Sequence, residues 1–445
     1  MSSNQETPST ESSVESSELE KPEKVELTTS YRYYALGILT MVYVFNFIDR
    51  QILVILQESI KVDLDLSDTQ LGLLSGISFA IFYVTCGIPI ARWADKGNRR
   101  NIVALAIGTW SFMTALSGLV QNFTHLLLAR IGVGVGEAGG SPPAHSMISD
   151  MFPEKERATA LSIYSMGINF GVLIGFVIGG YVNDWLGWRW VFLVVGAPGI
   201  LMALVVRFTL KEPPRGYSDN ITTKIETPPF LDVFKLLWSR KSFRHMSLAA
   251  GLHAFVGYGV GQWIGSFFIR SYELGSTGEI GFWLGIISGT AGATGTFLGG
   301  YLADRFGQKD KRWYVWIPAI ATIAAVPFSL AVYLLNNYSL ALMIYVVPVF
   351  LGAMYLGPTL AMTHGIVSLR MRALASSILF FVLNLIGLGL GPLFTGMLSD
   401  ALADTYGADS LRYALISVVL VYFWCGYHYI MAAKNIREDL KNAPN

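Results

Sequence analysis

The sequence predicts an all-α membrane protein with twelve transmembrane helices, arranged as two similar bundles of six. Three observations lead to this prediction. Of the 445 residues, 53% are hydrophobic and only 14% are charged, and the mean hydropathy is +0.48. Soluble domains carry about a quarter charged residues. Apolar segments long enough to cross a bilayer recur along the whole chain, and the loops between them repeat at corresponding places in its two halves.

The chain starts with a polar stretch and continues with the predicted spans. Residues 1–30 are rich in Ser, Glu and Thr and contain no apolar core, so we expect a disordered cytoplasmic tail rather than a signal peptide. Each later apolar segment has about 20 residues or more, as a helical span needs. The predicted spans cover residues 33–58, 70–94, 100–121, 123–150, 156–182, 189–210, 242–272, 279–303, 313–335, 338–365, 372–398 and 408–433.

A polar stretch with paired prolines at 213–214 and 228–229 divides the sixth span from the seventh. Such a stretch is typical of a linker. We therefore predict four parts after the N-terminal tail: a first bundle at 31–211, a cytoplasmic linker at 212–241, a second bundle at 242–433 and a cytoplasmic tail at 434–445.

The basic residues predict the orientation of the spans. With both termini placed in the cytoplasm, most of the 32 Lys and Arg residues lie on the cytoplasmic side, as the positive-inside rule requires. The outer loops then hold only Lys61, Arg189, Arg270 and Arg412. We therefore expect an integral protein of an inner or plasma membrane.

Composition also excludes several classes of function. The net charge of +1 gives no sign of nucleic acid as a partner. The two cysteines, Cys86 and Cys425, stand in apolar segments, where a free thiol behaves as a small hydrophobic group. We find no metal-ligand cluster, nucleophile elbow or phosphate-cradling Gly-Lys-Ser sequence, so we expect no metal, no cofactor, no catalytic residue and no enzymatic activity.

The two halves of the sequence repeat each other. ARWADKGNRR (91–100) follows the second span, and GGYLADRFGQK (299–309) follows the eighth. RATALSIYSMGIN (157–169) enters the fifth span, and RALASSILFFVLN (372–384) enters the eleventh. A duplication of six-helix halves places a substrate site near the membrane midplane, between the halves.

These motifs resemble the major facilitator superfamily of secondary transporters. Its cytoplasmic signature, G-x3-D-[RK]-x-G-x-[RK], is matched in full from Gly300 to Lys309, while the first copy has Ala91 in place of Gly and one residue fewer before its glycine. DMFPEKERA (150–158) resembles the family's loop between the fourth and fifth spans. FNFIDRQIL (45–53), GYVNDWLGWRWVF (180–192) and the run from Ala129 to Pro153 resemble the Spinster branch, which is associated with export of lysophospholipids and sphingolipids and with proton coupling.

Charged residues inside the first and fourth spans are the main candidates for a functional site. Arg130 and Glu137 are seven residues apart in ARIGVGVGEAGGSPP (129–143), almost two helical turns, so both lie on one helix face. Asp49 and Arg50 are adjacent in the first span and point about 100° apart. We therefore pair Asp49 with Arg130 and Arg50 with Glu137. Charge at this depth is costly and indicates a functional role.

The hypothesis is that Asp49 and Glu137 carry protons, while Arg50 and Arg130 form a charge network with these acids and the substrate. Protonation of one acid frees a base to bind an anionic head group, and a moving Arg changes the proton affinity of the acid. The alternative is a static polar clamp between the two spans, because some buried ion pairs only fix registry.

The seventh and tenth spans provide an aromatic and hydroxyl-bearing wall that would suit a lipid chain. Its candidate residues for the substrate site are Tyr258, Gln262, Tyr355, Thr359 and Thr363. For each of them, packing is the more ordinary explanation, because aromatic side chains are enriched at membrane boundaries.

Charged loop residues predict a cytoplasmic gate. An Asp at the end of one span can contact an Arg, or the first turn of a helix, in the opposite half, since the helix dipole favours an anion there. The resemblance implies that such positions govern conformational switching. The predicted gate consists of Asp95, Arg157, Asp304, Arg305 and Arg372. The alternative is that such loop charges are ordinary positive-inside anchors.

Together these features predict a secondary active transporter that moves an amphipathic lipid, a lysophospholipid or a sphingoid lipid, by alternating access. Proton coupling is expected, and the superfamily resemblance implies a monomer. One alternative is a transporter of a small organic anion or a drug, because the two arginines would bind any carboxylate or phosphate. An alternative of another class is a non-transporting membrane receptor or an enzyme.

Overall fold

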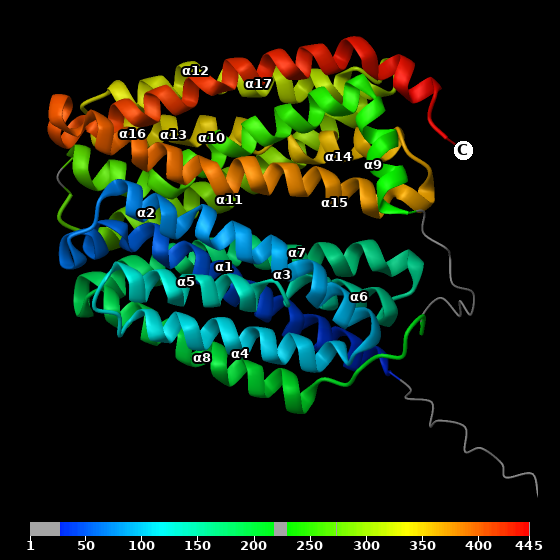
Figure 1. The fold of residues 1–445 in the computed structure, drawn as a ribbon, viewed down its shortest axis with the longest axis horizontal. Coiled ribbons are helices and arrows are strands. Elements are labelled where there is room, and N and C mark those ends of the chain that lie inside the picture. Colours follow the sequence, from blue (N-terminus) through cyan, green and yellow to red (C-terminus); the bar gives the residue numbers. More distant parts are fainter. Residues whose placement is uncertain (1–26, 218–228, 273, 445) are drawn as a thin grey trace, which may run out of the picture.

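The computed structural model describes residues 27–217, 229–272 and 274–444. Within these residues the chain runs the length of the bundle twelve times, and these twelve crossing segments form two groups of six (Figure 1). Both ends of the described chain lie at one end of the bundle, which we call the terminal face; the opposite end is the distal face. The predicted two-bundle, all-α architecture is confirmed.

The first group contains the helices up to residue 209. Polar caps define where several of them begin: the side chains of Asn98 and Asn122 accept hydrogen bonds from backbone N–H groups in the first turns of their helices, as N-caps do. The helices are α1 (Thr29–Leu64), α2 (Asp68–Ser75), α3 (Ile77–Lys96), α4 (Arg99–Ser117), α5 (Phe123–Glu137), α6 (Ser141–Met151), α7 (Glu154–Leu186) and α8 (Trp188–Thr209).

The second group repeats this arrangement after a short extra helix, α9 (Phe230–Ser239), which lies inside the predicted linker. The last helix continues to Lys441, although we expected a tail from residue 434. The remaining helices are α10 (Lys241–Tyr272), α11 (Thr277–Gly307), α12 (Trp313–Leu334), α13 (Tyr338–Gly352), α14 (Leu356–Gly365), α15 (Arg372–Leu383), α16 (Gly391–Tyr406) and α17 (Ser410–Lys441). The predicted N-terminal tail lies, up to residue 26, outside the described residues.

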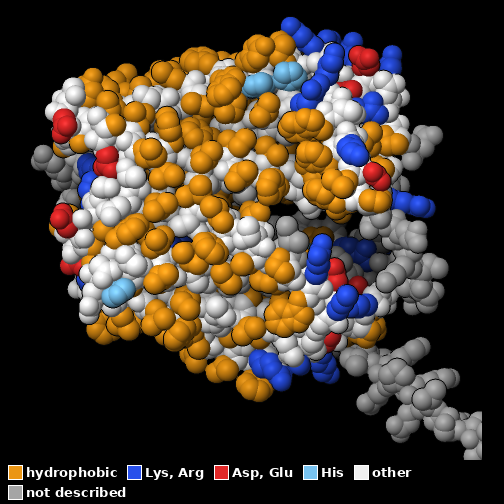
Figure 2. All heavy atoms as spheres, in the orientation of Figure 1, with side chains coloured by type: hydrophobic (Ala, Val, Ile, Leu, Met, Phe, Trp, Pro, Cys, Tyr) orange, Lys and Arg blue, Asp and Glu red, His pale blue; other side chains and the backbone are white. Residues whose placement is uncertain are grey.

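The surface of the bundle fits a membrane environment. Seven helical stretches of the described chain are long and apolar enough to cross a bilayer. Figure 2 shows hydrophobic side chains over the middle of the bundle and charged side chains gathered toward its two ends.

Equivalent spans of the two halves are interrupted near their middles. The fourth span breaks between Glu137 and Ser141, and the tenth breaks between Gly352 and Leu356. In the eleventh span, π-helical turns cover Asn384–Leu390, directly before Gly391-Pro392. Such bulges mark functional sites in many helices.

The two halves pack against each other along two helix pairs, which we call seams. In both seams a glycine lets the backbones of the two helices approach closely. Along the first seam α7 packs on α11, where Gly281 lies against the backbone of Phe176 with no room for a Cβ atom. Along the second, α2 packs on α16, where Gly396 lies equally close to the backbone of Asp68. The seams are therefore backbone-to-backbone contacts between equivalent pairs of helices.

Candidate functional site

An ion pair connects α1 with α5 inside the first half. The Nε atom of Arg50 donates a hydrogen bond of 2.7 Å to the Oε2 atom of Glu137. The Glu137 side chain is fully buried, whereas that of Arg50 is 19% exposed. This is the Arg50–Glu137 pair that the sequence predicts, and only its arginine side is accessible.

Aromatic rings surround the Arg50 guanidinium group. Its central carbon lies 5.2 Å from the ring centre of Phe47, 5.0 Å from that of Phe79 and 5.2 Å from that of Tyr83. Cation–π attraction in this geometry holds the guanidinium group in place. The guanidinium group is thus positioned on two sides, by a carboxylate and by aromatic faces.

Asp49 and Arg130 do not form the ion pair that we expected. Both side chains are buried, and neither carboxylate oxygen of Asp49 has a hydrogen-bond partner among the described residues. The Nε and Nη1 atoms of Arg130 likewise lack partners there. The electrostatic neighbours of Asp49 are Glu137 and Arg130, and Thr114 lies beside it. Asp49 and Arg130 are thus electrostatic neighbours in a buried network, but their charged atoms do not come into ion-pair contact.

A small pocket of about 60 Å³, the charged pocket, lies between the halves beside this network. From the first half it is lined by Arg50 and Arg130 with Phe47 and Phe79. From the second half Tyr258 and Gln262 of α10 complete its wall. The structure therefore brings together four residues that the sequence proposed separately: Arg50, Arg130, Tyr258 and Gln262.

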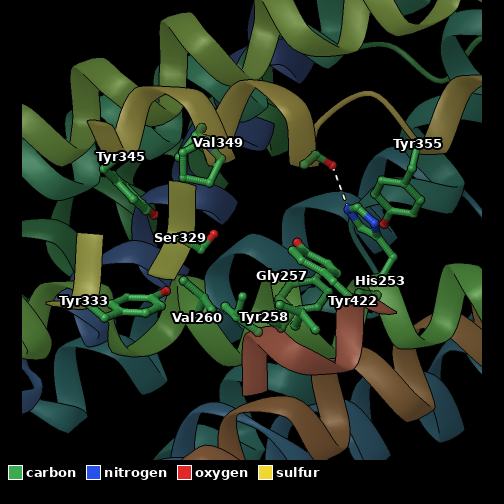
Figure 3. A pocket seen from close by; sticks show the side chains of 15 residues that line it. His253, Gly257, Tyr258, Val260, Ser329, Tyr333, Tyr345, Val349, Tyr355 and Tyr422 are labelled. Carbon is green, nitrogen blue, oxygen red and sulfur yellow. Dashed lines mark hydrogen bonds between the residues drawn. The ribbon is translucent and has the colours of Figure 1, made fainter. Parts of the chain in front are cut away.

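A larger cavity of about 260 Å³, the tyrosine pocket, lies in the second half (Figure 3). His253 is fixed there by hydrogen bonds to the carbonyl oxygen of Gly352 (2.8 Å) and to the Thr322 hydroxyl (3.0 Å), and it stacks on Tyr355 at 3.9 Å. Tyr258 lines this pocket as well as the charged pocket. The phenol-bearing residues that complete the lining are Tyr333, Tyr345 and Tyr422.

Two residues of the predicted wall lie elsewhere. The Thr359 hydroxyl bonds to the Tyr355 carbonyl oxygen and lies 3.1 Å from the Tyr429 hydroxyl, and the Thr363 hydroxyl bonds to the Thr359 carbonyl oxygen. Both side chains are buried within the second half, and neither lines either pocket. Their hydroxyl groups donate hydrogen bonds to backbone carbonyl oxygens one turn earlier in the chain and do not face a cavity.

The predicted gate residues lie at the terminal face, where the halves are apart. Asp304 accepts a hydrogen bond of 2.6 Å from Tyr314, and Arg305 donates one to Tyr301; both bonds stay within the second half. Arg157 donates to the Phe152 carbonyl oxygen in the first half. Asp95 and Arg372 are exposed. Figure 2 shows a hollow between the halves at this face.

At the distal face the halves are closed by polar contacts. Arg270 of α10 contacts both Asp68 (2.7 Å) and Glu58 (2.8 Å) of the first half. Asp400 accepts hydrogen bonds from the backbone N–H groups of Asp68 and Thr69 at the start of α2. Asp184 does the same for Thr277 and Gly278 at the start of α11. The halves therefore meet distally and separate toward the terminal face.

The family model of the Major Facilitator Superfamily matches residues 39–392. The chain belongs to this superfamily. A solved structure of a bacterial homologue of the human lysosomal transporter Spinster, in an inward-facing and unoccupied conformation, superposes with a TM-score of 0.84 at 36% identity. That alignment covers 93% of this chain and 99% of the other. The likeness within the superfamily is thus to the Spinster transporters, as the sequence motifs indicated.

Relatives of known sequence agree with this family. An "MFS-type efflux pump" of Mycolicibacterium smegmatis is 31% identical over 91% of this chain and 94% of its own length. A "Sphingosine-1-phosphate transporter" of Danio rerio is 25% identical over 92% of this chain and 85% of its own length. Membership of the superfamily identifies this protein as an integral membrane transporter rather than an enzyme.

Sequence reasoning missed several residues that this major facilitator structure makes prominent. Asp184 and Asp400 stand at span ends, where a carboxylate resembles any surface charge. Arg99 resembles an ordinary positive-inside anchor, yet it is fully buried and pairs with Asp150 and with Glu212. The signal for the tyrosine pocket was present, since tyrosines recur inside the ninth, tenth and twelfth spans, but the sequence does not show which of them share a cavity.

Proposed function

We propose that this protein carries an amphipathic lipid with an anionic or zwitterionic head group, a lysophospholipid or a sphingoid lipid. One observation carries the proposal: the charged pocket and the tyrosine pocket share the side chain of Tyr258. A cation-bearing compartment between the halves therefore borders an aromatic compartment in the second half. A ligand with a charged head and an apolar chain matches this division.

The chemistry of each compartment supports the assignment of head and chain. Arg50 presents a partly exposed guanidinium group, which binds phosphate or carboxylate oxygens with paired N–H groups. The tyrosine pocket has aromatic walls, and its volume of about 260 Å³ is just below the usual range of ligand pockets, about 300–1,000 Å³. A lipid would thus need both compartments, whereas a small anion would need only the charged pocket.

Proton coupling is part of this proposal, with Glu137 and Asp49 as the proton carriers. A head group that binds Arg50 competes with Glu137 for the same guanidinium group, which is 2.7 Å from the carboxylate. Release of Glu137 from Arg50 would leave a buried charge that a proton neutralises. Asp49, already without a hydrogen-bond partner among the described residues, would take part in the same exchange.

The arrangement of the halves supports alternating access. Applying the positive-inside rule, we place the terminal face and both termini in the cytoplasm, so the present conformation is open to the cytoplasm. Asp95, Arg157, Asp304, Arg305 and Arg372 would then join the halves only when the distal contacts break. The named activity of the Danio rerio relative, sphingosine-1-phosphate transport, supports a lipid substrate, and the name of the efflux-pump relative supports export as the direction of transport.

The test is lipid flux in proteoliposomes with an imposed pH gradient, for the wild type and Glu137→Gln. Glu438→Gln, an exposed acid at the end of α17, is the matched control. We expect lysophospholipid or sphingoid-lipid flux that follows the gradient in the wild type and the control but not in Glu137→Gln. Equal gradient dependence in all three proteins would contradict the role of Glu137. Flux of a small organic anion without lipid flux would favour that alternative substrate, and ligand binding without any flux would favour a receptor.

A further inference from the structure

The short helix α9 carries a strip of exposed aromatic residues that no crossing segment covers. Phe230, Phe234 and Trp238 follow one another every four residues, with ring centres 6.3 Å and 5.7 Å apart. Their exposed fractions are 55%, 37% and 44%. Leu231 beside them is also exposed. In water such a strip would be unfavourable, because its apolar area is contiguous.

The remaining faces of α9 show how the helix is held. Val233 and Leu237 are completely buried and pack α9 onto the second half, next to α10 and α15. With about 100° between successive residues, the aromatic strip lies between this buried face and a polar face. The polar face is formed by Asp232, Lys235 and Ser239. Around its circumference the helix therefore has three successive sides: one packed on protein, one that is apolar and exposed, and one that is polar and faces water.

The direction of α9 fits this division. In Figure 1, α9 runs across the terminal face, transverse to the long helices that cross the bundle. Since the crossing helices stand across the bilayer, α9 lies along the membrane surface. A helix with such an orientation, with aromatic residues on one side and charged residues on the other, is typical of the lipid interface.

Basic residues flank the aromatic strip. Lys235 on α9 and Lys241 at the start of α10 are exposed, and Arg244 follows one turn later. Lysine stems can lie along apolar surface while their ammonium groups reach lipid phosphates, and each basic residue near an anionic membrane surface adds about 1 kcal/mol of attraction. The charge of this rim is complementary to an anionic phospholipid head group.

We infer that α9 is an interfacial helix that inserts Phe230, Phe234 and Trp238 into the leaflet at the terminal face and binds anionic phospholipids there through Lys235 and Lys241. The occupant of this surface is the bilayer itself, and the inference does not depend on the transported substrate. Because α9 is packed onto α10 and α15, it anchors the second half at the membrane surface while the first half moves.

Quenching of Trp238 fluorescence by brominated lipids tests the insertion. The full-length protein and Trp238→Phe are reconstituted in phosphatidylcholine vesicles brominated on the acyl chains, and the difference of their emission isolates Trp238. The matched control is Ser239→Trp in the Trp238→Phe background, which moves the indole to the water side of the same helix. We expect Trp238 emission to fall at least twofold and the control emission to stay unchanged. Quenching of Trp238 by aqueous iodide, but not by brominated lipid, would overturn the insertion.

The head-group preference is tested in mixed vesicles in which only one lipid is brominated. At equal mole fractions, brominated phosphatidylglycerol should quench Trp238 more than brominated phosphatidylcholine, and Lys235→Gln with Lys241→Gln should remove the difference. Equal quenching by the two lipids in the unsubstituted protein would overturn the binding of anionic head groups.

Discussion

Asp184 and Asp400 hold mirrored positions in the two halves. Asp184, near the end of α7, binds the first backbone N–H groups of α11, and Asp400, in α16, binds those of α2. Each carboxylate thus caps a helix of the opposite half, where the helix dipole favours a negative charge. The same interaction, a carboxylate that caps the start of a helix in the opposite half, therefore occurs twice at the distal face.

Removal of one of these charges should weaken the distal closure. In Asp400→Asn the hydrogen bonds to Asp68 and Thr69 lose their ionic component, and a hydrogen bond to a charged group contributes roughly 1.5–3 kcal/mol. We expect the equilibrium to move about tenfold or more toward the distally open state, as measured by spin-label distances between distal helix ends. Asp404→Asn, an exposed acid one turn further along α16, is the control and should leave the distances unchanged. An unchanged distance distribution in Asp400→Asn would show that the cap does not hold the halves together.

Filling the tyrosine pocket should discriminate between lipids by chain length. Val349 lines this pocket, and Val349→Trp would occupy part of its volume of about 260 Å³. Overpacking of this kind costs about 1–3 kcal/mol, so flux of a long-chain lysophospholipid should fall about tenfold. Binding of glycerophosphocholine, which has the head group without the chain, should not change. The control is Val346→Trp, an exposed position on the same helix; equal losses in the two variants would point away from a chain site.

Lysine should not replace Arg50. Lys keeps the positive charge but lacks the planar guanidinium group that contacts Glu137 and three aromatic rings. We expect Arg50→Lys to reduce lipid flux at least about tenfold, with expression and thermal stability near those of the wild type. The control is Arg92→Lys, the same substitution at an exposed position. Wild-type flux in Arg50→Lys would mean that a point charge is sufficient at this site.

Arg99 should matter for stability rather than transport. It donates to Asp150, to the Oε1 atom of Glu212 (2.7 Å) and to the Pro213 carbonyl oxygen (2.6 Å), and its side chain is almost fully buried. Removing one partner of a fully buried ion pair costs roughly 3–5 kcal/mol. The two carboxylates left behind here are 17% and 25% exposed, so the loss should be smaller but still measurable. Arg99→Met should therefore lower the thermal midpoint in detergent by several degrees, whereas Arg92→Met should not. A midpoint equal to that of the wild type would disprove the structural role.

The repeated spans and loops could be predicted because hydropathy and motif spacing are properties of local sequence. The Arg50–Glu137 pair was also predictable, since intramembrane charges need partners and few were available. That Asp49 and Arg130 stay out of ion-pair contact was not predictable, because it depends on how α1 and α5 rotate against each other. Thr359 and Thr363 were assigned to the site by their span, yet the rotation of α14 turns them into the second half.

The contacts between the halves could not be predicted from the sequence either, because they depend on how the two bundles pack together. Asp184 and Asp400 find their partners only after the two bundles have docked, and each partner is a backbone N–H group, which every residue except proline carries. The same limit applies to α9, whose aromatic spacing is visible in the sequence but whose buried face depends on α10 and α15. Docking geometry, rather than local propensity, decides these features.

The glycine seams have a kinetic consequence. Where Gly281 meets Phe176 and Gly396 meets Asp68, the surfaces in contact are backbone, so rotation of one half against the other requires few side chains to exchange rotamers. At an interface of interlocked side chains, many side chains would have to separate and repack at the same time, which creates a free-energy barrier to the rotation. Backbone seams lower that barrier, and the rate of conformational exchange should then be limited by the breaking of the distal carboxylate caps.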